Sequence, residues 1–285
     1  MTITRLDLDG AGSPAALVTR ILQLEPALAL PVPVEQLCRQ FDITSIGELD
    51  TEGFEAALIM DECKSAGAIL VARDRSRQRR RFSIAHELGH FLIPSHLPRP
   101  GELSPCSAEH LRMHEVKEQD RRRRMEAEAN RFAALLLMPP PMLRAELKVI
   151  RHPDLSDVVR LARKFDVSKD AMARAYADYN REAVAIAVIS SGRVLRIYRN
   201  AGHFPALSVW KGQPVPAGSL ATASLQPGQI SNVEECEPGL WVRDPDDRTV
   251  AALTEQALGQ RNGYSLLMLV AELRDEEEFE MRPSW

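Results

Sequence analysis

The stretch RRRFSIAHELGHFLI, residues 79–93, decides the fold of the N-terminal part of the chain. Its apolar residues occupy the other faces of a helix that carries His86 and His90, which are four residues apart. Residues at this spacing project from one helix face, so both imidazoles can bind the same metal ion. Glu87 lies at the same edge, where it can take a proton from water bound to the ion. The pattern therefore predicts a helical metal site with a general base beside it.

Two zinc ligands need a third, and His96 is the first candidate. It stands where the HExxHxxGxxH pattern of metzincin proteases has its third histidine, but that pattern has glycine where this chain has Ile93. The glycine makes the sharp turn that returns the histidine to the metal. A β-branched residue followed by Pro94 does not supply a left-handed turn. The sequence thus disfavours His96 as a ligand and leaves it as a bystander.

The competing third ligand is a carboxylate on a second helix, near residue 126. Glu126 and Asn130 are four residues apart and share a face, whereas Glu128 points nearly opposite. Only one of the two acids can therefore face the site together with Asn130. A buried asparagine beside a ligand can hold it in place by a hydrogen bond. An HExxH motif with a later helical glutamate is the gluzincin plan, which the sequence favours over a third histidine.

Composition excludes several classes of protein. The chain has 285 residues, of which 45% are apolar, enough for two domains with their own cores. A net charge of -4 gives no overall attraction to nucleic acid or to anionic membranes. The N-terminus does not have the pattern of a secretory signal, and no apolar run is long enough to span a bilayer. We expect a cytoplasmic protein with no membrane partner.

Changes in periodicity along the chain predict an α+β protein with three parts. Residues 1–140 combine short strands with the HELGH helix, which Ser83 would cap, in a zinc-peptidase-like domain with a small sheet. Residues 141–181 form a helical extension with the spacing of a helix-turn-helix. Residues 182–285 are rich in β-like segments, and Asn262-Gly263 between two apolar runs is typical of a hairpin turn. For this last part we predict a sensor or regulatory role.

The second helix of the helix-turn-helix-like pair, KDAMARAYADY, has a mixed charge. It offers Lys169 and Arg174, but also Asp170 and Asp178, and no Asn or Gln that would read a base. A helix that reads DNA normally presents several such groups. The sequence therefore favours a structural helical subdomain, with direct DNA binding as the weaker alternative.

Two blocks of the sequence resemble the ImmA/IrrE family of metallopeptidases. Residues 79–93, followed by EAEANRFAALLLMP at 126–139, are similar to the family pattern RxxFTxAHELGH, a loop, and ExxANxFAxxLLMP. The resemblance covers about residues 25–180. Ser83 stands where the family usually has threonine, a difference that does not touch the chemistry.

The resemblance implies a metal site and a reaction. Carried over position by position, His86 and His90 match the metal-binding histidines, Glu87 matches the catalytic base, and Glu126 matches the third ligand, four residues before the motif's Asn130. The activity implied is that of a cytoplasmic, zinc-dependent metallo-endopeptidase. Members of the family typically cleave a helix-turn-helix repressor of the XRE type, and so switch on stress-response or mobile-element genes.

Two hypotheses follow from these observations. In the leading one, the protein uses Zn²⁺, with Mn²⁺ as an alternative, to cleave an XRE-type transcriptional repressor and relieve repression. In the second, the protein is a DNA-binding or metal-responsive regulator built on an inactive peptidase scaffold. Glu87 separates the two, because only the enzyme needs a general base.

Overall fold

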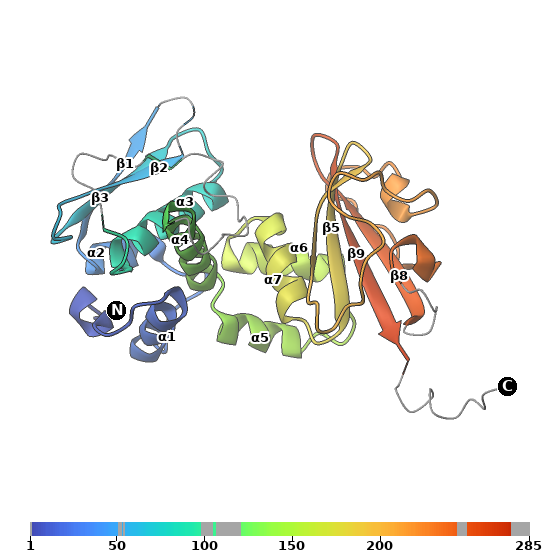
Figure 1. Cartoon of the computed structure of the whole chain (residues 1–285), viewed down its shortest axis with the longest axis horizontal. Coiled ribbons are helices and arrows are strands. Elements are labelled where there is room, and N and C mark those ends of the chain that lie inside the picture. Colours follow the sequence, from blue (N-terminus) through green and yellow to red (C-terminus); the bar gives the residue numbers. More distant parts are fainter. Residues whose placement is uncertain are drawn as a thin grey trace. The chain divides into compact units, whose positions relative to one another are not determined.

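The computed structural model describes residues 2–50, 53, 55–97, 105–106, 121–243 and 250–274. The chain divides into two compact units, one made of Met1–Pro140 and Arg163–Ser168, the other of Pro141–Ala162 and Lys169–Trp285 (Figure 1). Each unit combines helices with one sheet, and the C-terminal region is rich in strands. The predicted α+β class is therefore confirmed. In the described part of the chain, no helix has both the length and the apolar character to cross a bilayer.

The N-terminal unit builds a small sheet with helices packed against it. Its elements are η1 (Arg5–Leu8), α1 (Pro14–Leu24), α2 (Val34–Gln40), β1 (Ile43–Leu49), β2 (Ala56–Met60), β3 (Gly67–Ala72), α3 (Arg77–Leu92), β4 (Pro105–Cys106) and α4 (Arg121–Leu137). The sheet has the order β1-β3-β2-β4, in which β1 runs parallel to β3 and the other pairs are antiparallel. Helix α3 packs on β2 and β3, and α4 packs on α3 (Figure 1). The HELGH motif thus lies between the sheet and α4.

Helix α3 begins seven residues earlier than the apolar pattern predicts. Its N-cap is Ser76, whose hydroxyl accepts a hydrogen bond from the Arg79 amide, whereas Ser83 is buried inside the helix. The arginine run before the apolar segment is helical because a serine at the N-cap satisfies a free amide of the first turn. The helix ends at Leu92, and Ile93 is extended ahead of Pro94, as the proline predicts.

The arginines in front of the HELGH motif bind two buried carboxylates. The pairs and their N–O distances are Arg75–Glu55 at 3.0 Å, Arg79–Glu55 at 3.1 Å, Arg77–Asp166 at 2.6 Å and Arg81–Asp166 at 3.3 Å. Removing one partner of a buried ion pair leaves an uncompensated charge, which destabilises strongly. These pairs therefore fix the first half of α3 against the start of β2 and the turn at Asp166.

The C-terminal unit contains most of the remaining elements and an antiparallel sheet. The elements are α5 (Pro140–Lys148), α6 (Leu155–Phe165), α7 (Lys169–Tyr179), β5 (Ala183–Ser190), β6 (Arg193–Arg199), η2 (Leu220–Thr222), β7 (Glu234–Cys236), η3 (Pro238–Leu240), β8 (Val250–Gly259) and β9 (Tyr264–Leu273). The strand order is β6-β5-β9-β8-β7. Asn262 and Gly263 both have positive φ in the turn between β8 and β9, the hairpin that this dipeptide predicts.

The second helix of the helix-turn-helix-like pair, α7, packs on β5 and β6. Asp170 accepts hydrogen bonds from the hydroxyl of Tyr198 at 3.1 Å and from Arg196 at 3.3 Å. The guanidinium of Arg174 lies over the Tyr198 ring, 6.0 Å from its centroid. Charged side chains that a DNA-reading helix would leave free are thus engaged by a neighbouring strand. This packing supports the structural interpretation of the helix pair.

Candidate metal centre

The candidate site forms where α3 and α4 pack closely against each other, at Gly89. A Cβ atom on Gly89 would lie 3.0 Å from Cδ1 of Phe132 and 3.3 Å from Cα of Ala129. Because such contacts are tighter than most that real Cβ atoms make, a larger residue here would push Phe132 or the α4 backbone away. This close crossing brings Glu126, near the start of α4, to the histidines of α3.

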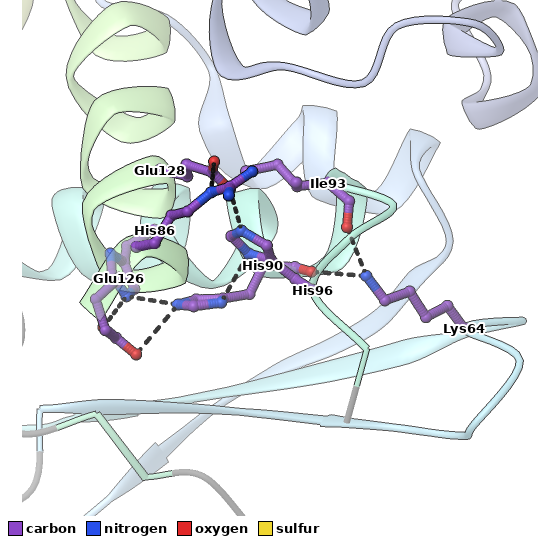
Figure 2. A network of polar contacts seen from close by, with 8 residues as sticks. Lys64, His86, His90, Ile93, His96, Glu126 and Glu128 are labelled. Atoms are coloured by element: carbon purple, nitrogen blue, oxygen red, sulfur yellow. Dashed lines mark hydrogen bonds and ion pairs between the residues drawn. The ribbon is translucent and has the colours of Figure 1, made fainter. Parts of the chain in front are cut away.

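Three side chains from the two helices converge (Figure 2). Nε2 of His86 lies 3.1 Å from Nε2 of His90. The two carboxylate oxygens of Glu126 lie 3.4 Å from His86 Nε2 and 3.6 Å from His90 Nε2. Among the described residues, this is the group of three or more His, Cys, Asp or Glu side chains that could hold a metal ion. The structure therefore brings together the three residues that the sequence predicts as ligands.

The spacing of these atoms fits a tetrahedral metal ion. With bonds of about 2.0–2.1 Å, the ligand atoms of such an ion lie roughly 3.3 Å from one another. The three measured separations, 3.1, 3.4 and 3.6 Å, bracket this value. Two imidazole nitrogens and one carboxylate are also the kind of donor set that holds a catalytic zinc ion with a coordination position left open. The residues present thus fit a metal ion.

Burial sets the charge of the site. It lowers the pKa of His86 to about 4, so this ring is neutral and its Nε2 can offer a lone pair. Burial on its own would raise the pKa of Glu126, but the neighbouring His86 and His90 rings hold that pKa well below its usual range. Glu126 is therefore a carboxylate at neutral pH. A cation at this site would replace a net negative charge with a positive one.

Asn130 lies one turn after Glu126 and contacts the other side of His86. Its Oδ1 atom is 3.1 Å from Nδ1 of His86, and both side chains are buried. An amide oxygen only accepts hydrogen bonds, so His86 donates from Nδ1, and its Nε2 faces Glu126. The contact is the one expected of a residue that orients a ligand.

Glu87 occupies the position next to His86 on α3 and is 1% exposed. Its carboxylate is thus enclosed in the protein between the two histidine positions of the motif. The general base predicted by the sequence is buried within one helical turn of both metal-binding candidates.

His96 and Glu128 have a relation to the site that the sequence did not predict. His96 is absent from the three-residue cluster, but its Nδ1 lies 3.1 Å from Nδ1 of His90. Its Nε2 lies 2.9 Å from Oε2 of Glu128 (Figure 2). The backbone amide of His96 donates to the carbonyl of Ile93, closing a turn that returns the chain to the helix. Both residues therefore reach the site through the far side of His90.

Lys64 is a second residue that the pattern did not reveal. Its Nζ donates to the backbone carbonyls of His90 at 3.0 Å and Ile93 at 2.8 Å (Figure 2). It thereby caps the C-terminal end of α3, where carbonyls have no partner within the helix. Burial lowers the pKa of Lys64 to about 8. No local sequence pattern predicts this contact, because Lys64 lies in the loop between β2 and β3, far along the chain from α3.

Residues 46–176 match the family model for peptidase M78, described as the IrrE N-terminal-like domain. These residues are similar to an IrrE N-terminal-like domain, and they are called the IrrE-like domain below. The match confirms the resemblance to the ImmA/IrrE family, and the IrrE-like domain contains His86, His90, Glu126 and Asn130. No curated protein matches the chain. Among solved structures, a Mycobacterium tuberculosis transcriptional regulator is similar, with 15% identity over 91% of this chain and 75% of that chain and a TM-score of 0.47.

Gly89→Ala in the IrrE-like domain tests the close crossing of α3 and α4. Alanine would favour the helix by about 1 kcal/mol, but the added methyl group overpacks against Phe132 and Ala129 by about 1–3 kcal/mol. We expect a lower melting temperature and weaker zinc binding, because α4 must move and carries Glu126 with it. Gly12→Ala is the matched control, since a Cβ there meets no atom within 4 Å. A more stable variant with unchanged zinc affinity would contradict this account.

Proposed function

We propose that the protein is a zinc-dependent endopeptidase that cleaves a helix-turn-helix transcriptional repressor of the XRE type. The observation that carries the proposal is the convergence of His86, His90 and Glu126 at distances suited to one metal ion. The IrrE N-terminal-like domain match supports the peptidase assignment. The repressor as substrate, the use of Zn²⁺ rather than Mn²⁺, and a cytoplasmic location belong to the proposal through the family resemblance.

His86, His90 and Glu126 would hold the ion, and Asn130 keeps Nε2 of His86 turned toward it. When bound, zinc supplies a Lewis acid that polarises the peptide carbonyl and acidifies water. Two neutral imidazoles and one carboxylate neutralise only one of its two charges, so the site keeps the positive charge that this chemistry needs.

Glu87 would act as the general base and later as the general acid. Its carboxylate takes a proton from the attacking water and passes the proton to the nitrogen of the leaving amine. Burial beside His86 places it in a water-poor setting, where proton transfer between fixed groups needs little solvent rearrangement. The same residue therefore serves both halves of the peptide hydrolysis.

The rest of the chain would select the substrate and respond to a signal. We assign the reaction to residues 1–140, a structural role to the helical subdomain at 141–181, and a sensor or regulatory role to residues 182–285. The contacts of Asp170 and Arg174 with β6 support a structural role for α7 rather than base reading. Specific cleavage of one regulator then fits better than general protein digestion.

Metal removal provides the direct test of the proposal. The purified protein, loaded with zinc, is incubated with an XRE-type repressor encoded beside its gene, and the fragments are identified by mass spectrometry. We expect cleavage at one site, its loss in the presence of a chelator, and its recovery when zinc is restored. The control is a repressor from an unrelated locus, which should stay intact.

Other results would reject the peptidase. Cleavage that persists in chelator would show a contaminating or metal-independent protease. A zinc-loaded protein that binds DNA without cleaving the repressor would favour the alternative function, a metal-responsive regulator on an inactive peptidase scaffold.

A further inference from the structure

The side chains of His90, His96 and Glu128 form a continuous line of contacts that leads away from the candidate metal centre. His90 Nδ1 lies 3.1 Å from His96 Nδ1, and His96 Nε2 lies 2.9 Å from Glu128 Oε2 (Figure 2). The His96 side chain is fully buried, and Glu128 is 27% exposed. The other face of His90 carries Nε2, which lies beside His86 and Glu126. The line therefore ends on the ring nitrogen opposite the candidate ligand atom.

The end of the line determines the direction of every hydrogen bond in it. A carboxylate only accepts, so His96 donates to Glu128 from Nε2. A neutral imidazole that donates from one nitrogen accepts at the other, so Nδ1 of His96 accepts from Nδ1 of His90. His90 then carries its proton on Nδ1, and its Nε2 has a free lone pair. This is the tautomer that a metal ligand at Nε2 requires.

Both ends of the line are held in place by other contacts. Oε1 of Glu128 accepts from Nε of Arg124 at 3.1 Å, one helical turn earlier, which leaves Oε2 for His96. At the other end, Lys64 binds the carbonyls of His90 and Ile93, from which the turn to His96 departs. The geometry is thus fixed by side chains from the β2–β3 loop, from α4 and from the end of α3.

We propose that His96 and Glu128 are positioning residues that fix the orientation and tautomer of His90, so that its Nε2 faces the metal ion. This inference rests on the metal site of the proposed function. It adds the residues that orient the second histidine ligand. His86 is oriented by the neutral amide of Asn130, whereas His90 is oriented by a carboxylate through an intervening imidazole. An anionic end group makes the ligand nitrogen more basic, and such partners strengthen metal binding.

The test measures zinc affinity by competition with a chromophoric chelator, independently of peptide cleavage. Glu128→Ala removes the end of the line and should raise the Kd for zinc about tenfold, the lower end of the usual range for such partners. Glu128→Gln retains an oxygen that accepts from His96 but loses the negative charge, so its loss of zinc affinity should be smaller than that of Glu128→Ala. His96→Phe keeps a ring in the buried position but cannot accept from His90, and we expect its loss of affinity to exceed that of Glu128→Ala.

Arg122→Ala is the matched control, because it removes a positive charge from an exposed position on the same helix, α4. Its zinc affinity should equal that of wild type. A second readout is the ¹⁵N spectrum of histidine-labelled, metal-free protein, in which His90 should carry its proton on Nδ1 in wild type. In Glu128→Ala, the protons of His90 should distribute over both nitrogens.

The outcomes separate this inference from the proposed function. If Glu128→Ala binds zinc like wild type, or if wild-type His90 is protonated on Nε2, the positioning role is wrong even though the repressor is cleaved. If the variants weaken zinc binding in the expected order but the wild type cleaves no repressor, the positioning role stands and the peptidase fails.

Discussion

Glu87→Gln should keep the metal and lose peptide cleavage by about 10²–10⁴-fold, the usual contribution of a general base. Glutamine has nearly the same shape as glutamate, but its amide does not take a proton from water at neutral pH. The proposed metal-binding atoms belong to His86, His90 and Glu126, so zinc content should remain at one ion per chain. The measurements are kcat for repressor cleavage and zinc by atomic absorption.

The control for Glu87→Gln is Glu35→Gln, which removes the same charge from an exposed position on α2. This variant should cleave at the wild-type rate. Wild-type cleavage by Glu87→Gln, in the test tube and in the cell, would mean that another group removes the proton. Loss of zinc from the variant would instead show that Glu87 belongs to the metal site.

Glu126→Ala should abolish the stabilisation that zinc gives to the folded chain. A ligand that binds only the native state at 100 times its Kd adds about 2.7 kcal/mol, which raises the melting temperature by about 5–10 °C for a unit of this size. Without the Glu126 carboxylate, the two histidines alone bind the ion weakly, and we expect no shift at the same zinc concentration. Differential scanning calorimetry with and without zinc measures both effects.

The acid two residues further along α4 provides the comparison for Glu126→Ala. Glu128→Ala retains all three proposed ligands, and a tenfold higher Kd leaves about 1.4 kcal/mol of the zinc stabilisation, roughly half. If zinc raised the melting temperature of Glu126→Ala as much as that of wild type, but did not raise that of Glu128→Ala, Glu128 would be the ligand. The metal would then lie beside His96.

Local spacing was enough to predict the part of the site that lies on one helix. His86 and His90 contact each other because residues four apart share a helix face, whatever the rest of the fold does. The contact of Glu126 with both histidines is different, because it requires α4 to cross α3 at Gly89. The residues alone favour an acid on the second helix over His96 as the third ligand. The family resemblance matches that acid to Glu126.

The contacts around His96 could not be predicted from helical geometry. Glu126 and Glu128 are two residues apart and point in nearly opposite directions on α4, which excludes them from binding the same atom. Both acids nevertheless belong to one network of contacts, because His96 contacts His90 on one side and Glu128 on the other. Pro94 does end the helix, as predicted, but the following turn brings His96 back on the side away from Glu126.

The hydrogen bonds of Lys64 with the end of α3 have a consequence for how a metal ion would arrive. Free helix ends fray, and His90, which lies in the last turn of α3, would share that motion. Lys64 anchors the His90 and Ile93 carbonyls to the β2–β3 loop, so the end of α3 that carries His90 is already ordered when the chain has folded. Little conformational entropy then remains to be lost on binding. Metal exchange at this site should therefore be a capture by a rigid receptor rather than a folding event.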